Sequence, residues 1–339
     1  MQSMRRIVVV GDGGWGTAMS MVLAGTGHEV GIWSYDPEYA ELMRATRTNP
    51  RYLPGFDIPE TVEISADLSA LLPRTDILVS AVPTSFLRAV WSAHAELLPP
   101  TLPIVSLSKG LEDQTLLRPT EILAEVTGTE RVISVLSGPN IAREIAAGMP
   151  ATSVVASPDA ELARQIQVDF SGDRFRVYSN PDLIGVELGG VLKNVIALAA
   201  GMCDGMEVGV NAKASLVTRG MLEMARLGQA LGAERRTFFG LSGLGDLYTT
   251  CESRSSRNRT FGERIGRGEQ VADIAASMNQ VAEGVKSSRP VHDLMVDKDL
   301  TLPISHEVFR IIHEAKPPRE ALLALMRRAH KDETHDLDF

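Results

Sequence analysis

The chain of 339 residues is poor in cysteine, in aromatic residues and in positive charge. Its two cysteines, Cys203 and Cys251, allow at most one disulfide bridge, which favours a reducing cytoplasm with both thiols as small buried hydrophobes. Lysine and arginine number 34 against 43 aspartates and glutamates. The net charge of −9 therefore argues against nucleic-acid binding, which normally requires a basic face.

We also expect no targeting, membrane or metal-binding signal in the sequence. The apolar stretch near the N-terminus meets Asp12 too soon for a signal peptide, and we expect no apolar run long enough to span a bilayer. The seven histidines are scattered, without the spacing of metal ligands. We therefore expect a cytoplasmic protein without membrane insertion or a metal site, and the length predicts two domains.

A buried strand that turns sharply into a helix is predicted over Ile7 to Ala18. Gly11, Gly13 and Gly16 in this stretch fit the pattern G-x-G-x-x-G. The first glycine allows a tight turn, the second lets the backbone approach a pyrophosphate, and the third lets helix and strand pack closely. The helix N-terminus adds N–H groups and a partial positive charge, so the stretch predicts a bound dinucleotide.

Ser34, Tyr35 and Asp36 follow a second short apolar strand, at the place where the adenosine ribose of such a cofactor is held. Asp36 is either a ribose partner or the N-cap of a helix that begins at Pro37, and in the second case Ser34 and Tyr35 stand nearer the sugar. The residues leave both interpretations open. The choice between NAD and NADP stays open for the same reason.

The hydrophobic periodicity changes once along the chain. Strand-like and helix-like segments alternate up to about Tyr178, which predicts an α/β domain with a Rossmann-like, doubly wound, mostly parallel sheet. Long helical patterns then take over, so we predict a dinucleotide-binding domain over residues 1–182 and an all-α substrate domain over residues 183–339. The strands are expected at Ile7 to Val10, Val30 to Trp33, Val62 to Ile64, Ile77 to Val82, Pro103 to Leu107, Val132 to Val135, Thr152 to Ala156 and Arg174 to Tyr178.

Polar residues that follow the predicted strands are candidates, because ligands of an open α/β sheet collect at the carboxyl ends of its strands. Lys109 precedes a glycine turn there, within reach of a phosphate or a carbonyl oxygen, or else as a solvated loop residue. Asn140 follows another strand and is expected to cap a helix that starts at Ile141.

The strongest catalytic candidate is Lys193, the only basic residue in a helix predicted over Leu183 to Met202. This helix is apolar nearly all round, which predicts a central, buried position. The residues at intervals of four from Lys193 have almost no side chain: Gly185, Gly189, Ala197 and Gly201. They predict a groove that admits a substrate or the edge of the other domain, and desolvation there lowers the pKa of an ammonium. The alternatives are a lysine that reaches the surface or pairs with Glu187.

Two later segments supply an acid and an anion site. Asp246 follows three closely spaced glycines, and it is either presented at a defined place or caps the next helix. The stretch Ser253 to Arg259 precedes a helical segment predicted over Thr260 to Ile265. Its hydroxyls, guanidinium groups and N–H groups form either a phosphate cradle or a solvated basic turn.

Eight segments, taken in this order, form a specific pattern: Gly11 to Ala18, Ser108 to Gly110, Ser137 to Pro139, Phe175 to Asp182, Leu188 to Ala197, Gly243 to Leu247, Ser256 to Arg259 and Val281 to Gly284. In these segments the chain resembles the bacterial NAD(P)-dependent glycerol-3-phosphate dehydrogenases, over nearly its whole length. The resemblance implies reversible reduction of dihydroxyacetone phosphate to sn-glycerol 3-phosphate, a precursor of glycerophospholipids, with NAD or NADP in the cytoplasm.

The resemblance also implies roles for individual residues, with Lys193 at the position of the catalytic lysine. Substrate contacts are implied for Lys109, Gly138, Asn140, Asp246, Ser256, Arg257 and Asn258, and Asn194 is expected to help orient the substrate carbonyl. Beside the glycines at 11, 13 and 16, cofactor contacts are implied for Gly14, Trp15, Tyr35, Lys109, Ala142, Arg257, Val281 and Glu283.

Three residues depart from the family's pattern. Asp12 replaces the small residue usual between the first two glycines, and it either points to solvent or weakens cofactor binding. Asn140 stands where threonine or serine is frequent, and Tyr35 where histidine or another polar residue often occurs. Both keep their capacity for hydrogen bonds.

The implied mechanism uses Lys193 as acid in reduction and as base in oxidation, while hydride passes between the nicotinamide and the substrate C2.

A dehydrogenase for 3-hydroxyacids or 6-phosphogluconate is a competing hypothesis, but it does not require the Ser256-Arg257-Asn258 anchor. A non-catalytic nucleotide sensor is another competing hypothesis, but it does not require Lys193 or Asp246.

A homodimer is expected, since it is the commonest soluble assembly.

Overall fold

The computed structural model describes residues 4–278, 282–330 and 332–333. Its contacts divide the chain into two compact units, residues 1–112 with 117–183, and residues 113–116 with 184–339. Within the described residues, the first unit holds the strands, and the second is helical.

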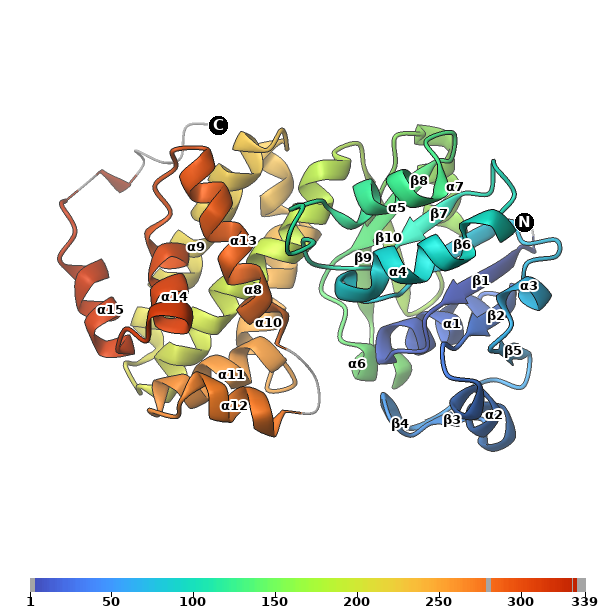
Figure 1. Cartoon of the computed structure of the whole chain (residues 1–339), viewed down its shortest axis with the longest axis horizontal. Helices are drawn as coiled ribbons and strands as arrows, with labels where there is room; N and C mark the ends of the chain where they lie inside the picture. Colours follow the sequence, from blue (N-terminus) through green and yellow to red (C-terminus); the bar gives the residue numbers. More distant parts are fainter. Residues whose placement is uncertain (1–3, 279–281, 331, 334–339) are drawn as a thin grey trace. The chain divides into compact units, whose positions relative to one another are not determined.

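The first unit is built on an eight-stranded sheet with the order β10-β9-β8-β7-β6-β1-β2-β5 (Figure 1). Neighbouring strands pair in parallel, except that β8 and β9 are antiparallel. The prediction of a doubly wound, mostly parallel sheet is confirmed, and each predicted strand is present. The strands are β1 (Arg6–Val10), β2 (Glu29–Trp33), β5 (Val62–Ser65), β6 (Ile77–Ser80), β7 (Ile104–Ser106), β8 (Ile133–Ser137), β9 (Ala151–Ala156) and β10 (Phe175–Asn180).

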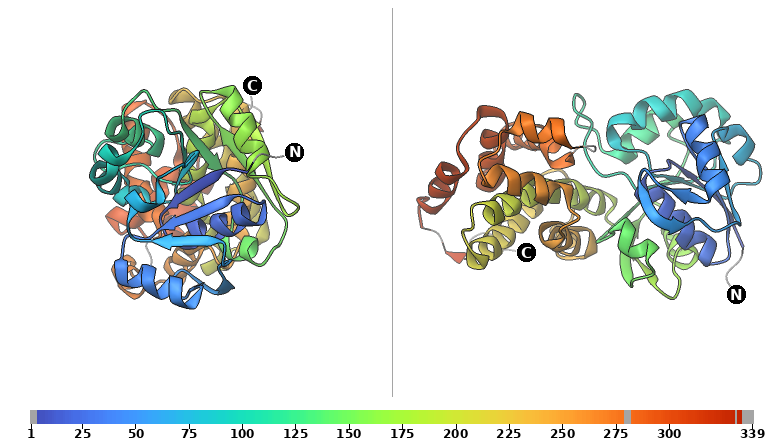
Figure 2. Two further views of the ribbon diagram at one scale, coloured as in Figure 1. Left: turned by 90° about the vertical axis from the view of Figure 1, so that its right-hand side faces the viewer. Right: turned by 90° about the horizontal axis from the view of Figure 1, so that it is seen from below.

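Helices cover both faces of this sheet because its central strands are apolar on both sides. Along β1, Ile7 and Val9 join one core cluster, whereas Val8 and Val10 join the other. Residues of α1 (Gly14–Gly25), α2 (Pro37–Thr46), α6 (Ala142–Ala146) and α7 (Ala160–Asp169) fill the first cluster. Residues of α3 (Leu68–Leu71), α4 (Thr84–His94) and α5 (Pro119–Thr127) fill the second, and a short turn, η1 (Ala95–Leu97), follows α4. Figure 2 shows the ribbon of the first unit from two further sides, with helices on either side of its strands.

The turn between β1 and α1 depends on two of its glycines for backbone geometry. Gly11 has a φ of 117°, and a Cβ at Gly16 would overlap the carbonyl oxygen of Gly11. A Cβ at Gly13, in contrast, would meet no described atom within 4 Å. The first and third glycines therefore serve the fold, and the second leaves space open beside the backbone.

Gly16→Ala is expected to lower the free energy of unfolding by about 2 kcal/mol, because its Cβ must push α1 away from the turn. Gly13→Ala is the matched control and should change the free energy by less than about 0.5 kcal/mol. Denaturation in urea measures both variants. Equal losses would contradict this account of the turn.

A two-stranded hairpin, β3 (Thr48–Asn49) and β4 (Leu53–Asp57), stands outside the main sheet and was not predicted. The buried Asn49 ties it to the glycine-rich turn, where its amide donates to the Asp12 carbonyl oxygen at 2.7 Å and to Thr17 Oγ1 at 2.8 Å. The strand signal is weak because one strand has two residues and the other contains a proline and a glycine.

The second unit confirms the prediction of an all-α domain, since its described residues contain helices and no strand. Its helices are α8 (Leu183–Gly205), α9 (Val210–Ala230), α10 (Asp246–Glu252), α11 (Arg257–Gly266), α12 (Val271–Ser277), α13 (Glu283–Asp297), α14 (Pro303–Glu314) and α15 (Pro318–Met326). Two short turns, η2 (Arg235–Phe239) and η3 (Leu241–Gly245), precede α10.

Helix α8 is the buried centre of this unit, as predicted, because every residue from Gly185 to Cys203 is buried. The expectation that no apolar run could span a bilayer was wrong, since α8 is long and apolar enough by length and composition. However, 89% of its most apolar window is buried inside the structure, which is typical of a core helix.

Both cysteines are free and buried, as predicted from their low number. Burial raises the pKa of the Cys203 thiol to about 11 and that of Cys251 to about 12. Both therefore stay protonated near neutral pH and behave as small hydrophobic residues.

The small-residue face of α8 does not form the predicted groove, because the unit's own chain fills it. A Cβ at Gly189 would lie 2.5 Å from the carbonyl oxygen of Ser242 in η3. A Cβ at Gly201 would overlap the carbonyl oxygen of Arg259 in α11. The glycines thus allow close backbone packing, and the residues that pack there could not be identified from α8 alone.

A buried carboxyl group, Glu223 on α9, holds the start of α14. It accepts hydrogen bonds from the backbone N–H of Ile304 at 2.6 Å and of Ser305 at 2.9 Å, and from the Ser305 hydroxyl at 2.9 Å. Burial raises the pKa of the Glu223 carboxyl to about 7, although these hydrogen bonds lower it. The folded state therefore binds the proton of the Glu223 carboxyl more tightly than the unfolded state does. As a result, the free energy of unfolding falls as pH rises from about 4.5 to about 7.

Comparing wild type with Glu223→Gln isolates this effect, because glutamine does not titrate. The free energy of unfolding of wild type is expected to fall relative to that of the variant as pH rises from about 5 to about 7.5. Urea denaturation at several pH values measures the difference. Parallel pH profiles of the two proteins would contradict the raised pKa.

Candidate functional site

The glycine-rich turn of the first unit can hold an anion. Gly13 is the N-cap of α1, and within the described residues no side chain caps this helix and no acidic residue lies in its first turn. The first N–H groups of α1 therefore suit a pyrophosphate, and the open space at Gly13 lets one approach.

The other predicted cofactor contacts of this region surround the same turn. A Cβ at Gly14 would lie 3.9 Å from the Cβ of Ala142 in α6. Trp15 is partly buried against Phe175, with ring centroids 6.3 Å apart. The structure thus brings together Gly11, Gly13, Gly14, Trp15, Gly16 and Ala142.

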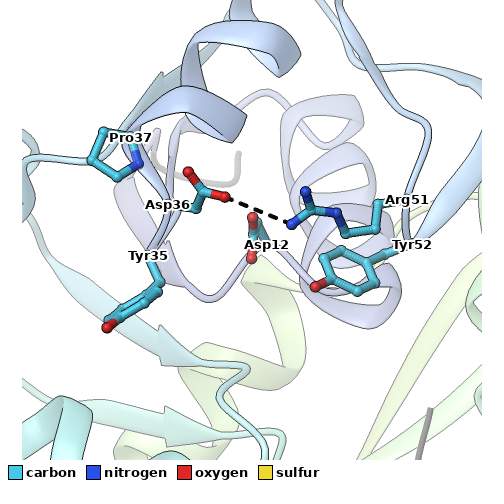
Figure 3. Close-up of a pocket in the computed structure, with 6 residues that line it drawn as sticks. All are labelled: Asp12, Tyr35, Asp36, Pro37, Arg51 and Tyr52. Carbon is cyan, nitrogen blue, oxygen red and sulfur yellow. Dashed lines mark ion pairs between the residues drawn. The ribbon is translucent and has the colours of Figure 1, made fainter. Parts of the chain in front are cut away.

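A pocket of about 520 Å³ lies beyond the carboxyl end of β2, next to this turn. Its lining residues are Asp12, Tyr35, Asp36, Pro37, Arg51 and Tyr52 (Figure 3). Tyr35 stands at its rim and is 78% exposed. Of the two interpretations of Asp36, the cap is confirmed, because its carboxylate accepts from the backbone N–H groups of Glu38 at 3.1 Å and of Tyr39 at 3.2 Å.

Asp12 does not point to solvent, so that alternative was wrong. The partly buried carboxylate of Asp12 accepts a hydrogen bond from the Ser34 hydroxyl at 2.7 Å. Burial raises the pKa of the Asp12 carboxyl, and the Ser34 hydrogen bond and the charge of Arg51 lower it. Sequence reasoning missed Ser34, Arg51 and Tyr52 as neighbours of Asp12, because the hairpin that carries the last two was not predicted.

Lys109 and Asn140 lie on the loops that follow β7 and β8. Lys109 Nζ donates to the carbonyl oxygen of Gly138 at 3.2 Å, which joins the two loops. The Asn140 amide donates to the Thr152 carbonyl oxygen at 3.1 Å, and its oxygen accepts from Ser153 Oγ at 2.8 Å.

The expectation that Asn140 caps the next helix was wrong. Helix α6 begins at Ala142, and among the described residues no side chain caps it. Because β9 runs antiparallel to β8, the first residues of β9 lie beside the loop and bind the Asn140 amide instead.

In the second unit, Lys193 is buried and only 6% exposed, so the alternative of a lysine at the surface was wrong. Its Nζ donates to Asp246 Oδ1 and, at 2.8 Å, to Thr250 Oγ1. Asp246 is itself 2% exposed. The structure thus brings the predicted lysine and the predicted acid into direct contact inside a predominantly apolar core.

Backbone packing explains this contact. Gly189 precedes Lys193 by one helical turn and allows the π-helical turn η3 to approach α8 closely. Asp246, the first residue of α10, then faces Lys193, so of its two interpretations the placement at a defined position is confirmed and the cap was wrong. Thr250 follows one turn later on α10; sequence reasoning missed it, although its spacing of four residues from Asp246 was an available signal.

A second network joins α8, α11 and the start of α13. The Asn258 amide donates to Asn194 Oδ1 at 2.9 Å, and its oxygen accepts from the backbone N–H of Gly284 at 2.8 Å. Asn194 Nδ2 donates to Glu283 Oε2 at 3.5 Å. These residues therefore position one another, and their contacts with a ligand stay predictions.

Helix α11 begins within the predicted phosphate cradle, three residues before the predicted start. Ser256 is its N-cap, and the hydroxyl accepts from the backbone N–H of Arg259 at 3.2 Å. Arg257, the first helical residue, is exposed.

Val281, one of the predicted cofactor contacts, lies outside the described residues. Over the described part of the chain, no group of three His, Cys, Asp or Glu side chains is placed to hold a metal ion.

Comparisons with known proteins assign both halves of the chain to one family. Models described as NAD-dependent glycerol-3-phosphate dehydrogenase N-terminus and C-terminus match residues 6–163 and 182–323. A relative from Frankia casuarinae, named glycerol-3-phosphate dehydrogenase (NAD(P)+), is 47% identical over 326 residues, which cover 96% of this chain and 97% of that protein. A relative of the same name from Streptomyces coelicolor is 46% identical over 330 residues, which cover 97% and 98%.

A solved structure supports the same assignment. Glycerol-3-phosphate dehydrogenase from Coxiella burnetii superposes with a TM-score of 0.90 at 37% sequence identity, covering 96% of this chain and 99% of that one.

Proposed function

The chain belongs to the NAD-dependent glycerol-3-phosphate dehydrogenase family, and we propose that Lys193 is the general acid and base of its reaction. The enzyme interconverts dihydroxyacetone phosphate and glycerol 3-phosphate with NAD or NADP, a step of lipid biosynthesis. The observation that carries the proposal is the buried contact of Lys193 with Asp246 and Thr250, since an amine fixed in an apolar core is placed for proton transfer.

The role of Lys193 follows from its surroundings. When bound, NAD or NADP supplies the hydride acceptor or, in reduced form, the donor. During reduction, Lys193 Nζ donates a proton to the oxygen on the substrate C2; during oxidation, the neutral amine takes the hydroxyl proton. Asp246 and Thr250 hold Nζ in one place before the reaction, so little reorganisation is needed as charge develops on the oxygen.

We propose that the substrate phosphate binds at the start of α11. Arg257 supplies a guanidinium there, and the first turn of the helix supplies N–H groups, with Ser256 at its cap. Binding energy on the phosphate then positions the reacting carbon. Further substrate contacts are proposed for Lys109, Gly138, Asn140, Asn194 and Asn258. In addition to the residues of the glycine-rich turn, cofactor contacts are proposed for Tyr35, Lys109, Arg257, Val281 and Glu283.

A steady-state assay on the full chain tests the substrate. Oxidation of reduced cofactor should require dihydroxyacetone phosphate, and kcat/KM for unphosphorylated dihydroxyacetone should be lower by about 10² or more. Faster turnover of a 3-hydroxyacid or of 6-phosphogluconate would favour a related dehydrogenase instead.

We also propose that the enzyme is a cytoplasmic homodimer forming sn-glycerol 3-phosphate for glycerophospholipid synthesis. Two free thiols suit a reducing compartment, and two-fold dimers are the commonest assemblies. Light scattering should give about twice the chain mass of 36.7 kDa. A mass of one chain would exclude the dimer.

A further inference from the structure

The pocket at the end of β2 contains a carboxylate contributed by the glycine-rich turn. Figure 3 shows the side chains of Asp12, Asp36 and Arg51 around one common space. In a dinucleotide-binding domain, this place beyond the second strand receives the adenosine ribose. The hydroxyl or phosphate on the ribose 2′ carbon is the group that distinguishes NAD from NADP.

Asp36 is the carboxylate that chain position alone would select as the ribose partner, but its oxygens are already used. Oδ1 caps α2 through two backbone N–H groups. Oδ2 lies 3.7 Å from the guanidinium of Arg51. Asp36 therefore fixes α2 and balances the charge of Arg51.

Arg51 is held beside Asp36 by aromatic rings. Its guanidinium lies 4.2 Å from the ring centroid of Tyr39 and 5.8 Å from that of Tyr52. Stacking and the ion pair thus compete with any other anion for this guanidinium.

Asp12 is held at the pocket from two sides. Ser34 donates to its carboxylate at 2.7 Å, and the buried Asn49 binds its backbone carbonyl oxygen at 2.7 Å. With Arg51 balanced by Asp36, the Asp12 carboxylate gives the pocket a net negative charge. A phosphate on the ribose would bring nearly two further negative charges to this place.

We propose that Asp12 selects NAD(H) against NADP(H), by accepting a hydrogen bond from the ribose hydroxyl and repelling a 2′-phosphate. The inference rests on the proposed function, because it assigns the specificity of the cofactor that this function requires. Like charges brought together in a partly desolvated pocket disfavour the wrong ligand strongly, and a fixed carboxylate cannot withdraw from the contact.

Direct binding of NADH and NADPH to the full chain, followed by cofactor fluorescence, tests the proposal without turnover. The Kd for NADPH should exceed that for NADH by about tenfold or more in wild type. Asp12→Asn keeps the size of the side chain and an acceptor for Ser34, but removes the charge. It should tighten NADPH binding by about tenfold and weaken NADH binding by up to about tenfold, because the ribose hydroxyl loses a charged acceptor, so that the ratio of the two Kd values falls.

Two further variants separate Asp12 from general charge effects. Glu41→Gln removes the same charge from an exposed residue of α2 and should leave the ratio of the two Kd values unchanged. Asp36→Asn should change that ratio much less than Asp12→Asn. A larger change from Asp36→Asn would overturn the inference and make Asp36 the selecting residue.

Equal Kd values for the two cofactors in wild type would also overturn it, as would selective loss of NADPH binding in Arg51→Ala, which would make Arg51 a phosphate ligand. None of these results would affect the proposed function, which fails separately if dihydroxyacetone phosphate supports no turnover with either cofactor.

Discussion

Lys193→Ala is expected to lower kcat for reduction of dihydroxyacetone phosphate by about 10² or more, because the only proposed proton donor to the C2 oxygen is lost. The Kd for NADH should change by less than about threefold, since the glycine-rich turn is intact. Steady-state kinetics and cofactor fluorescence measure the two quantities. Near-normal turnover would reject the assignment of Lys193.

Removing Lys193 also leaves Asp246 as a buried carboxylate without this partner, which is strongly destabilising in comparable cases. The double variant Lys193→Ala with Asp246→Asn removes both charges and therefore controls for folding. We expect it to unfold at a higher urea concentration than Lys193→Ala but to stay inactive. Recovery of activity in the double variant would show that Lys193→Ala had failed through its fold.

Arg257→Ala is expected to raise KM for dihydroxyacetone phosphate by about 10- to 100-fold, the usual effect of losing a charge-assisted hydrogen bond. Its effect on kcat/KM for unphosphorylated dihydroxyacetone should be small, because this substrate lacks the group that Arg257 is proposed to bind. Steady-state kinetics with both substrates gives the comparison.

The matched control is Arg267→Ala, which removes an exposed arginine at the other end of α11. The KM of this variant for dihydroxyacetone phosphate should stay within about twofold of the wild-type value. An unchanged KM in Arg257→Ala, or equal changes in the two variants, would remove the proposed phosphate site from the start of α11.

The strands and the central helix were predictable because their signals are local. Consecutive residues of β1 enter opposite core clusters, so the whole strand is apolar, and α8 is apolar around its full circumference. Lys193 and Asp246 were found for the same reason, since each is a charged residue in an apolar or glycine-rich setting.

The wrong predictions concern which segments pack against a given helix or strand, because the sequence of that helix or strand does not specify its neighbours in space. The groove on α8 was predicted as open because the sequence did not reveal that η3 and α11 pack against its glycines. Asn140 was predicted as a cap because the antiparallel direction of β9 is not encoded in β8. Asp12 was left undecided because the hairpin that carries Arg51 has little strand signal.

A crystal structure of the full chain with NAD+ and dihydroxyacetone phosphate, a pair that cannot react, tests the central claim most directly. The account predicts Lys193 Nζ within about 2.6–3.2 Å of the oxygen on the substrate C2, or one water away, with the phosphate at the start of α11. A bound substrate whose C2 oxygen lies beyond that reach of Nζ would contradict it.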